Sequence, residues 1–283
     1  MFDSIGPRQD IPAPDVNTDS QTMAWFMDAF SQKTGFPVPE CVTGKPISLG
    51  GSEGRSNSTS RGCIICAREA LMTKHQPIKG VTAAVQGYGN VGSWSAAFLH
   101  EMGAKVVAVS DSTGGAYAKE GLDPALALKH KKSSGTVVGT EGTREISNEE
   151  LLKLDVDLLV PAALENAITA KNASEVKAKI VCEGANGPTT PAADKILKEN
   201  GVLVVPDILA NSGGVAVSYF EWVQNLNRDH WTEEDVNRRL EQKMVAAFRA
   251  VHDWSEKHRV TMREGALALS ISKVADAMKT LGF

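Results

Sequence analysis

The chain has 283 residues, of which 42% are hydrophobic and 23% are charged, and its formal net charge is -4. These values are typical of a globular protein with one large core or two modest ones. The mild negative charge argues against nucleic acid as a partner, because nucleic-acid binding needs a strongly basic surface. No apolar run is long enough to cross a membrane, and the first residues lack the layout of a signal peptide. We therefore expect a cytoplasmic protein with no membrane partner.

The first predicted element is a helix within residues 18–35, where apolar residues recur at helical spacing. Thr18 or Asp19 can cap its start, and Gly35 can end it. Residues 36–62 are rich in Gly, Pro and Ser and predict a long loop, a feature that is often functional. A second helix is predicted over 63–75.

That second helix contains Cys63 and Cys66, which form a C-x-x-C pair inside an apolar run. Four cysteines are too few for a disulfide framework in a chain of this length. A metal site would need a second pair of ligands, and neither Cys41 nor Cys182 belongs to a pair. We interpret Cys63 and Cys66 as core residues and expect no metal site.

From residue 81 onward, short apolar strands alternate with helices. The segments with a predicted strand are 81–86, 104–110, 154–163, 177–186 and 201–211. The predicted helices between them are 93–103, 123–132, 148–154 and 190–200, and three more follow over 215–228, 232–258 and 267–283. Such alternation indicates β-α-β units and a parallel sheet. We predict an α/β fold: a Rossmann-like, doubly wound, mainly parallel sheet with an N-terminal helical lead and C-terminal helices.

A glycine loop follows the predicted strand 81–86 and opens the next helix. Its residues are Gly87, Tyr88, Gly89, Asn90, Val91 and Gly92. The three glycines permit a tight turn, close approach of a pyrophosphate to the backbone, and close packing of helix on strand. A turn that binds nothing is the alternative. The strand, loop, helix and following acid in register favour a dinucleotide site.

The acid is Asp111, which ends the next predicted strand and would contact the ribose hydroxyls of the cofactor. A carboxylate there would repel a 2′-phosphate, which favours NAD. The neighbouring hydroxyl donor Ser112 leaves NADP open. From these residues alone, the prediction is a nicotinamide-dependent oxidoreductase.

Further stretches resemble the glutamate dehydrogenase family, within the Glu/Leu/Phe/Val dehydrogenases. They include "IGPRQDIPAPDV", "GKPISLGGSEGR", "QGYGNVGSWSA", "EGANGPTTPAAD" and "VPDILANSGGVAVSYFEWVQN", in the family's order from Ile5 to Phe283. The resemblance implies oxidative deamination of L-glutamate to 2-oxoglutarate and ammonia with NAD or NADP. It also implies a homo-oligomer, because family members are usually hexamers.

The resemblance assigns roles to single residues. Asp15 would transfer protons at the substrate nitrogen, held in place by the prolines of "DIPAPDV". The further cofactor residues would be Thr59, Asn186 and Asn211, and the substrate pocket would be shaped by Val215 and Ser218. Ser218 would hydrogen-bond the distal carboxylate of glutamate.

Two departures from the family pattern stand out. The family writes the loop near Thr59 as "GR-x-x-A-T-G-R-G", whereas this chain has Ser58 and Ser60 in place of alanine and glycine. If that glycine were required by the backbone, Ser60 would disturb nicotinamide binding. The sequence also contains no K-G-G, the setting of the family's substrate-domain lysines. Lys45 is interpreted as an ordinary loop lysine.

The predicted organisation is a remnant of the substrate domain with a hinge helix over 1–45, an NAD(P)-binding Rossmann domain over 46–225, and a C-terminal helical segment over 226–283. We therefore expect an incomplete product, an excised segment or a stand-alone descendant, with impaired hydride transfer from glutamate. Two other functions stay open. One is a non-catalytic dinucleotide-binding protein or subunit partner, and the other is a dehydrogenase of a different amino acid.

Overall fold

The computed structural model describes residues 2–15 and 17–283, so Val16, the last residue of "DIPAPDV", lies outside the described residues. The chain forms two compact units. The first comprises Met1–Thr59 and Gly213–Gln242, and the second comprises Ser60–Ser212 and Lys243–Phe283. This division does not test the domain boundaries proposed from the sequence, which stay a prediction.

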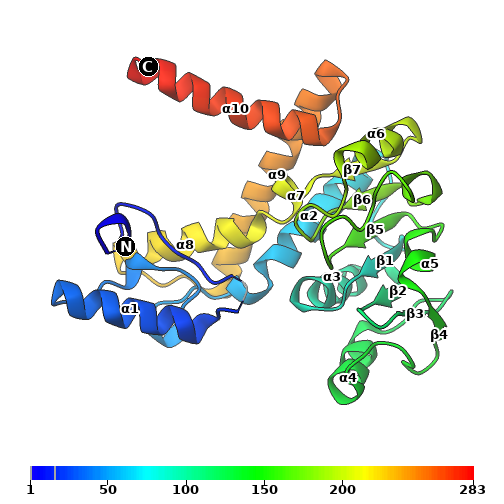
Figure 1. Ribbon diagram of the computed structural model, residues 1–283, viewed down its shortest axis with the longest axis horizontal. Coiled ribbons are helices and arrows are strands. Elements are labelled where there is room, and N and C mark those ends of the chain that lie inside the picture. The colour runs from blue at the N-terminus through cyan, green and yellow to red at the C-terminus, as the bar shows by residue number, and fades with distance from the viewer. Residues whose placement is uncertain (1, 16) are drawn as a thin grey trace. The chain divides into compact units, whose positions relative to one another are not determined.

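The second unit is built on a seven-stranded sheet with the order β4-β3-β2-β1-β5-β6-β7 (Figure 1). The strands are β1 (Thr82–Gln86), β2 (Lys105–Ser110), β3 (Gly115–Tyr117), β4 (Arg144–Ile146), β5 (Leu158–Pro161), β6 (Ile180–Cys182) and β7 (Leu203–Val205). Strands β2, β1, β5, β6 and β7 pair in parallel, whereas β3 and β4 add antiparallel pairs at one edge.

The strand order reverses at β1, which lies between β2 and β5. The chain therefore leaves the carboxyl ends of these neighbouring parallel strands in opposite directions, and open α/β sheets bind ligands at such a switch point. The glycine loop follows β1 at this position. The loops after β5, β6 and β7 emerge at the same edge of the sheet, because all these strands are parallel.

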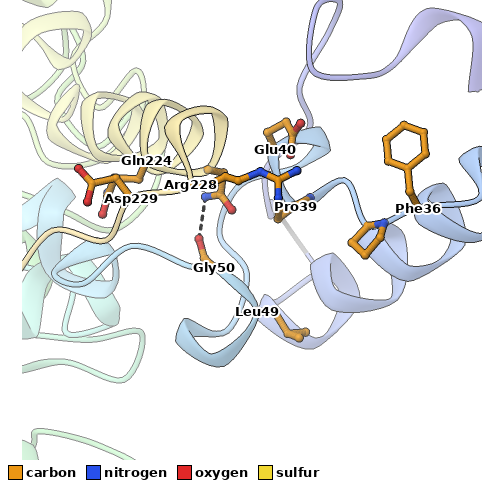
Figure 2. Close-up of a pocket in the computed structure, with 10 residues that line it drawn as sticks. Phe36, Pro39, Glu40, Leu49, Gly50, Gln224, Arg228 and Asp229 are labelled. Atoms are coloured by element: carbon orange, nitrogen blue, oxygen red, sulfur yellow. Dashed lines mark hydrogen bonds between the residues drawn. The ribbon is translucent and has the colours of Figure 1, made fainter.

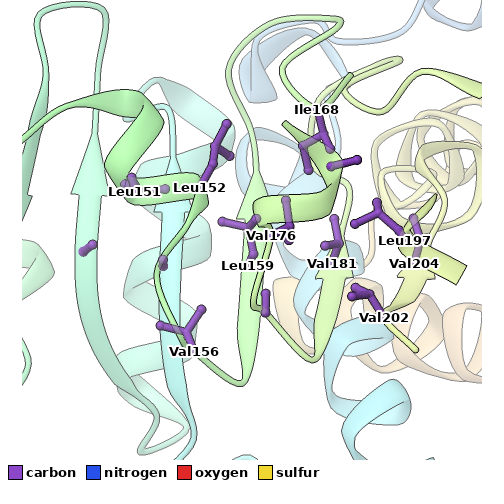
Figure 3. Packing of buried hydrophobic residues seen from close by; sticks show 14 of the residues in the cluster. Leu151, Leu152, Val156, Leu159, Ile168, Val176, Val181, Leu197, Val202 and Val204 are labelled. Atoms are coloured by element: carbon purple, nitrogen blue, oxygen red, sulfur yellow. The ribbon is translucent and has the colours of Figure 1, made fainter. Parts of the chain in front are cut away.

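One face of the sheet carries a buried apolar cluster that joins strands to helices α5 (Asn148–Leu152) and α6 (Pro191–Glu199). Figure 3 shows Leu151 and Leu152 of α5 over one part of the sheet, and Leu197 of α6 beside Val181 of β6 and Val204 of β7. All five are less than 9% exposed. Burying side chains of this size contributes about 1.5–3 kcal/mol each, so the cluster fixes both helices against the strands.

The remaining elements of the second unit flank this sheet. They are α3 (Asn90–Glu101), α4 (Pro124–Ser134), η5 (Ala173–Glu175), α7 (Asp207–Ala210) and α10 (Met262–Leu281). Helices α2 (Ser58–Thr73) and α9 (Glu233–His258) contain residues of both units. Helix α4 begins with Asp123 as N-cap and Pro124 in its first turn, and it ends at Gly135, which has a φ of 86°.

The first unit contains α1 (Ser20–Thr34), α8 (Gly213–Asn227) and four short 3-10 helices. These are η1 (Phe2–Ser4), η2 (Pro39–Cys41), η3 (Ile47–Leu49) and η4 (Arg55–Asn57). Asp19 caps α1 in a capping box with Thr22, and Gly35 ends it at a φ of 82°. Both predicted caps of this helix are confirmed.

The Rossmann-like α/β fold with mainly parallel strands is confirmed. Strands β3 and β4 were not predicted, because three-residue strands at a sheet edge carry no apolar run. Helix α10 begins at Met262 rather than near residue 267, with Thr261 and Glu264 forming a capping box. The interpretation of Cys63 and Cys66 as core residues is confirmed, since both are buried. Among the described residues, no helix is both long and apolar enough to span a membrane.

Candidate active site

The glycine loop between β1 and α3 has the shape that a pyrophosphate requires. Gly87 has a φ of +91°, and a Cβ atom there would lie 2.7 Å from the carbonyl oxygen of Ala162. A Cβ atom on Gly92 would lie 1.8 Å from the carbonyl oxygen of Gly87. The chain's own packing therefore requires both glycines. Nothing lies within 4 Å of a Cβ position on Gly89, and this open space lets a phosphate reach the backbone.

Helix α3 begins at Asn90, directly after that open space, and its N-cap Gly89 makes no side-chain cap hydrogen bond. The N–H groups of a first turn and the positive end of the helix dipole favour an anion. The Tyr88 side chain is buried, and its hydroxyl donates to the carbonyl oxygen of Pro124 at 2.8 Å. The Tyr88 side chain is therefore engaged in the interior, and only the backbone of Tyr88 is left to contact a cofactor. The residues present fit the pyrophosphate of a dinucleotide.

Asp111, directly after β2, is buried and engaged by donors of the chain itself. Its Oδ2 atom accepts a hydrogen bond from the Val137 N–H at 2.8 Å and lies 3.2 Å from Lys131 Nζ. Its Oδ1 atom accepts from the Thr113 N–H at 3.0 Å and from the Thr136 hydroxyl at 3.1 Å. Burial raises the pKa of Asp111, but these donors and the Lys131 charge outweigh burial and lower it. Binding of this carboxylate to a ribose stays a prediction.

Asn186 follows β6, and Asn211 follows α7, which itself follows β7. The two side chains meet, with Asn211 Nδ2 donating to Asn186 Oδ1 at 2.6 Å. They come together because β6 and β7 are adjacent parallel strands whose loops leave the same edge. The Asn186 amide N–H groups and the Asn211 amide oxygen lie outside this bond, so the pair offers both donors and an acceptor to a ligand.

The loop that carries Asp15 is fixed through its backbone while the Asp15 side chain is exposed. The Thr18 hydroxyl donates to the Asp15 carbonyl oxygen at 2.9 Å and accepts from the Asp15 N–H at 2.7 Å. Pro14 lies directly against Gly44, where a Cβ atom would be 2.5 Å from the Pro14 Cδ atom. An exposed carboxylate on a fixed backbone suits a proton-transfer group.

Ser218, on α8, is buried and accepts a hydrogen bond of 3.0 Å from Arg55 Nε, whereas Val215 is exposed at the start of the same helix. Burial lowers the pKa of the Arg55 guanidinium, and the charge of Glu221 opposes this. Within residues 2–15 and 17–283, no carboxylate forms an ion pair with Arg55. A partly buried cation beside a hydroxyl can bind a carboxylate.

Arg55 is not among the site residues predicted from the sequence. The available signal was an arginine within the glycine-rich loop, directly after Gly54, which has a φ of +70°. Thr59, which was predicted, lies against the start of α8. A Cβ atom on Gly214 would lie 2.5 Å from its hydroxyl oxygen, so glycine at 214 permits this approach.

The interpretation of Lys45 as an ordinary loop lysine is wrong. Its side chain is fully buried, and its Nζ atom lies 2.7 Å from Glu221 Oε1 on α8. Lys45 Nζ also donates to the Val42 carbonyl oxygen at 2.6 Å, and Glu221 Oε2 accepts from the Gly44 N–H at 3.0 Å. These additional hydrogen bonds replace the ones that the two charged groups would make with water. The pair fastens the segment that contacts Pro14 to the helix that carries Ser218.

A separate cavity of about 430 Å³ lies in the first unit at the carboxyl end of α8. Figure 2 shows Phe36, Pro39, Glu40 and Leu49 on one side and Gln224, Arg228 and Asp229 on the other. None of the predicted site residues lines this cavity. The candidate features are therefore the glycine loop and the paired asparagines in the second unit and, separately, the Arg55–Ser218 contact in the first unit.

These features belong to a known family of enzymes. A family model described as Glutamate/Leucine/Phenylalanine/Valine dehydrogenase matches residues 50–282. The chain belongs to this family. A second model, the dimerisation domain of the Glu/Leu/Phe/Val dehydrogenases, matches residues 1–32. The resemblance stated from the sequence motifs is thus confirmed.

The chain is similar to glutamate dehydrogenases in particular. It is 54% identical over 279 residues to a glutamate dehydrogenase of Thermotoga maritima, covering 98% of this chain and 67% of that protein. It is 48% identical over 279 residues to a cryptic catabolic NAD-specific glutamate dehydrogenase of Bacillus subtilis, covering 99% of this chain and 65% of that protein. The chain thus spans about two thirds of the length of these relatives.

Solved structures agree with this assignment. A hetero-hexameric glutamate dehydrogenase from Thermus thermophilus superposes with a TM-score of 0.93 at 38% identity, covering all of this chain and 67% of that chain. A glutamate dehydrogenase from Peptoniphilus asaccharolyticus superposes with a TM-score of 0.87 at 38% identity, covering all of this chain and 68% of that chain.

Proposed function

We propose that this chain takes part in the NAD-dependent oxidative deamination of L-glutamate to 2-oxoglutarate and ammonia. The observation that carries the proposal is the 3.0 Å hydrogen bond between Arg55 Nε and the Ser218 hydroxyl. A guanidinium held in this way can bind a carboxylate with its remaining N–H groups while the hydroxyl supplies a further bond. A second carboxylate, beyond the α-carboxylate common to amino acids, is what distinguishes glutamate from leucine, valine and phenylalanine.

Each proposed site residue has a separate task in this scheme. Arg55 and Ser218 bind the distal carboxylate, and Val215 shapes the pocket beside them. Asp15 moves protons at the substrate nitrogen. Thr59 and the paired asparagines orient the cofactor. When bound, the nicotinamide supplies the hydride acceptor.

The cofactor proposed is NAD, since relatives at 48% identity are named NAD-specific glutamate dehydrogenases. The glycine loop Gly87–Gly92 would hold the pyrophosphate. Asp111 and the exposed Ser112 would lie towards the ribose. The internal ion pair between Asp111 and Lys131 partly offsets the negative charge there, so NADP is a weaker second cofactor rather than an excluded one.

Two further functions are weaker proposals. A binding protein without catalysis is favoured by the absence of a K-G-G sequence, but it gives Asp15 no role. A dehydrogenase for an apolar amino acid would leave the Arg55 guanidinium without an anionic ligand.

We also propose that the chain assembles as a homo-oligomer, and specifically as the hexamer usual in the family. The dimerisation-domain match over residues 1–32 supports this assembly. A cytoplasmic location stays a prediction from sequence.

Calorimetric titration of the purified chain with NADH and then with 2-oxoglutarate tests the proposal. We expect NADH to bind and 2-oxoglutarate to bind the loaded chain, with a steady-state rate far below that of the longer relatives because no K-G-G lysine is present. Arg55→Met should weaken 2-oxoglutarate binding about tenfold or more, since a charged hydrogen bond contributes about 1.5–3 kcal/mol. Arg238→Met, which removes an exposed arginine paired with Asp235, is the matched control.

Three results would count against specific parts of the proposal. Failure to bind either NADH or NADPH would remove its premise. Equal binding of 2-oxoglutarate and the keto acid of leucine would favour the dehydrogenase of another amino acid. A rate equal to that of the longer relatives would show that the K-G-G lysines are not needed.

A further inference from the structure

Arg263, in the first turn of α10, gathers three carboxylates from three separate segments of the second unit. Its Nη2 atom lies 2.6 Å from Glu183 Oε1, and its Nη1 atom lies 3.0 Å from Asp207 Oδ1. Its Nε atom lies 3.6 Å from Asp194 Oδ2, an ion pair without a hydrogen bond. The Arg263 side chain is only 19% exposed, and that of Glu183 is fully buried. The arrangement is therefore an interior cluster rather than a surface salt bridge.

Two of these carboxylates belong to the loops that carry the paired asparagines. Glu183 directly follows β6 and begins the loop to Gly187, which contains Asn186. Asp207 is the first residue of α7, which is followed by Asn211. Arg263 thus contacts the first residue after β6 in the one segment and the first residue of α7 in the other.

Backbone hydrogen bonds continue these contacts to the asparagines. The Asp207 N–H donates to Glu183 Oε2 at 2.7 Å, and this bond joins the two segments directly. Asp207 Oδ2 accepts a hydrogen bond of 2.8 Å from the N–H of Gly187, the residue that directly follows Asn186. The Asp207 carbonyl oxygen accepts from the Asn211 N–H at 3.0 Å. Hydrogen bonds of Asp207 therefore lead from the guanidinium to the backbone of Asn211 and to Gly187, the neighbour of Asn186 in the chain.

The charges make this cluster dependent on Arg263. Burial raises the pKa of Glu183 and of Asp194, and the Arg263 charge works against burial in both cases. Without the guanidinium, these carboxylates would lie close together with no cation to compensate them. Removing one partner of a buried ion pair is strongly unfavourable, so the loops would move apart or the carboxyl groups would take up protons.

The glycine loop is held by other contacts. Gly87 is fixed by close approach to Ala162, and Tyr88 is fixed by its bond to the carbonyl oxygen of Pro124. No contact of Arg263 among those of the described residues reaches Gly87–Gly92. A change at Arg263 should therefore separate the two halves of the dinucleotide site.

We propose that Arg263 is a positioning residue for the nicotinamide half of the cofactor: it holds the loops after β6 and β7 so that Asn186 and Asn211 are presented as one hydrogen-bonded pair. The proposal rests on the proposed NAD-dependent function. Arg263 acts through Glu183 and Asp207 and does not itself touch the cofactor.

The test compares NADH with ADP-ribose, which shares the pyrophosphate and adenosine but lacks the nicotinamide. Calorimetric titration is made on the full chain and on Arg263→Gln and Arg263→Lys. Arg249→Gln is the control, because it removes a guanidinium from an exposed ion pair with Glu69 in the same unit. Arg263→Gln should weaken NADH binding about tenfold and change ADP-ribose binding less than about twofold. Arg263→Lys should fall between, since an ammonium cannot bond three carboxylates in a fork.

A second measurement needs no ligand. The side-chain amide resonances of Asn211, assigned by their loss in Asn211→Ala, should shift in Arg263→Gln and Arg263→Lys and stay in place in Arg249→Gln. Unchanged Asn211 resonances would overturn the proposal, as would equal weakening of NADH and ADP-ribose in a folded Arg263→Lys variant. If the unsubstituted chain binds neither ligand, the proposed function fails instead, and the Asn211 resonances still decide whether Arg263 holds the asparagines.

Discussion

The hydroxyl of Ser60 donates a hydrogen bond of 2.9 Å to the carbonyl oxygen of Val91, inside the glycine loop. Ser60 stands where the family pattern has glycine. It lies within helix α2 and has no positive φ, so the backbone does not require glycine at this position. The expected disturbance of the loop therefore has no basis in the backbone, and the hydroxyl instead fastens the loop to α2.

Ser60→Ala is expected to weaken NADH binding a few-fold and to lower the free energy of unfolding by about 1 kcal/mol, the usual net contribution of one hydrogen bond. Ser60→Gly should lower the free energy of unfolding further, because glycine inside a helix costs up to about 1 kcal/mol. Urea unfolding and NADH titration measure both effects. The control is Ser272→Ala, whose exposed hydroxyl also donates to a helix carbonyl. Tighter NADH binding by Ser60→Gly than by the unsubstituted chain would contradict this account.

The buried pair of Lys45 and Glu221 gives a second prediction. Lys45→Met and Glu221→Leu should each lower the free energy of unfolding by about 3–5 kcal/mol, since each leaves the other partner in the interior without compensation. The double substitution Lys45→Met with Glu221→Leu should cost much less than the sum of the two single ones, because no charge is then buried.

Urea unfolding of the three variants checks this coupling. Lys105→Met removes the exposed partner of Glu120 and is the control, with an expected loss below about 1 kcal/mol. Single variants as stable as this control would show that the interior pair does not hold α8 in place.

Sequence patterns predicted the sheet and the glycine loop because both depend on local signals. The β1 strand is a short apolar run, and the three glycines recur at short fixed spacing directly after it, although Gly87 meets its obstacle at Ala162, just beyond β5. Lys45 and Arg55 were not predicted in their roles, because their partners, Glu221 and Ser218, lie more than 160 residues along the chain. A single sequence contains no signal for such pairings. Arg263 was missed for the same reason.

Asp111 is a case in which the predicted residue is present but already engaged. Because its carboxylate holds the Val137 N–H and pairs with Lys131, Asp111→Asn should lower the free energy of unfolding of the chain even without cofactor, by about 1–3 kcal/mol. If it also contacts the ribose, NAD binding should weaken more than the binding of nicotinamide mononucleotide, which lacks the adenosine. Thermal unfolding without ligand and titration with both ligands separate these effects. Unchanged stability would contradict the structural role.

The pH dependence of stability can be predicted at Asp157. Burial alone would raise its pKa, but hydrogen bonds from Lys179 and Thr82 outweigh burial and lower the pKa to about 2 from an ordinary value of 3.8. Lys179 Nζ lies 2.7 Å from Asp157 Oδ1, and the Thr82 N–H donates to Oδ2 at 2.9 Å. Since the folded chain holds the ionised form more tightly than the unfolded chain, this contribution is complete above pH 3.8 and is lost as the pH falls towards 2.

Asp157→Asn is therefore expected to lower the free energy of unfolding by about 2 kcal/mol at neutral pH, the equivalent of the pKa difference. The difference between variant and parent should shrink as the pH falls below 3.8 and nearly vanish near pH 2. Urea unfolding of both chains across this range measures it. Asp155→Asn makes the same charge change at an exposed position and should have little effect at any pH. A difference that stays constant down to pH 2 would show that the ionised carboxylate is not what joins β1 to the segment before β6.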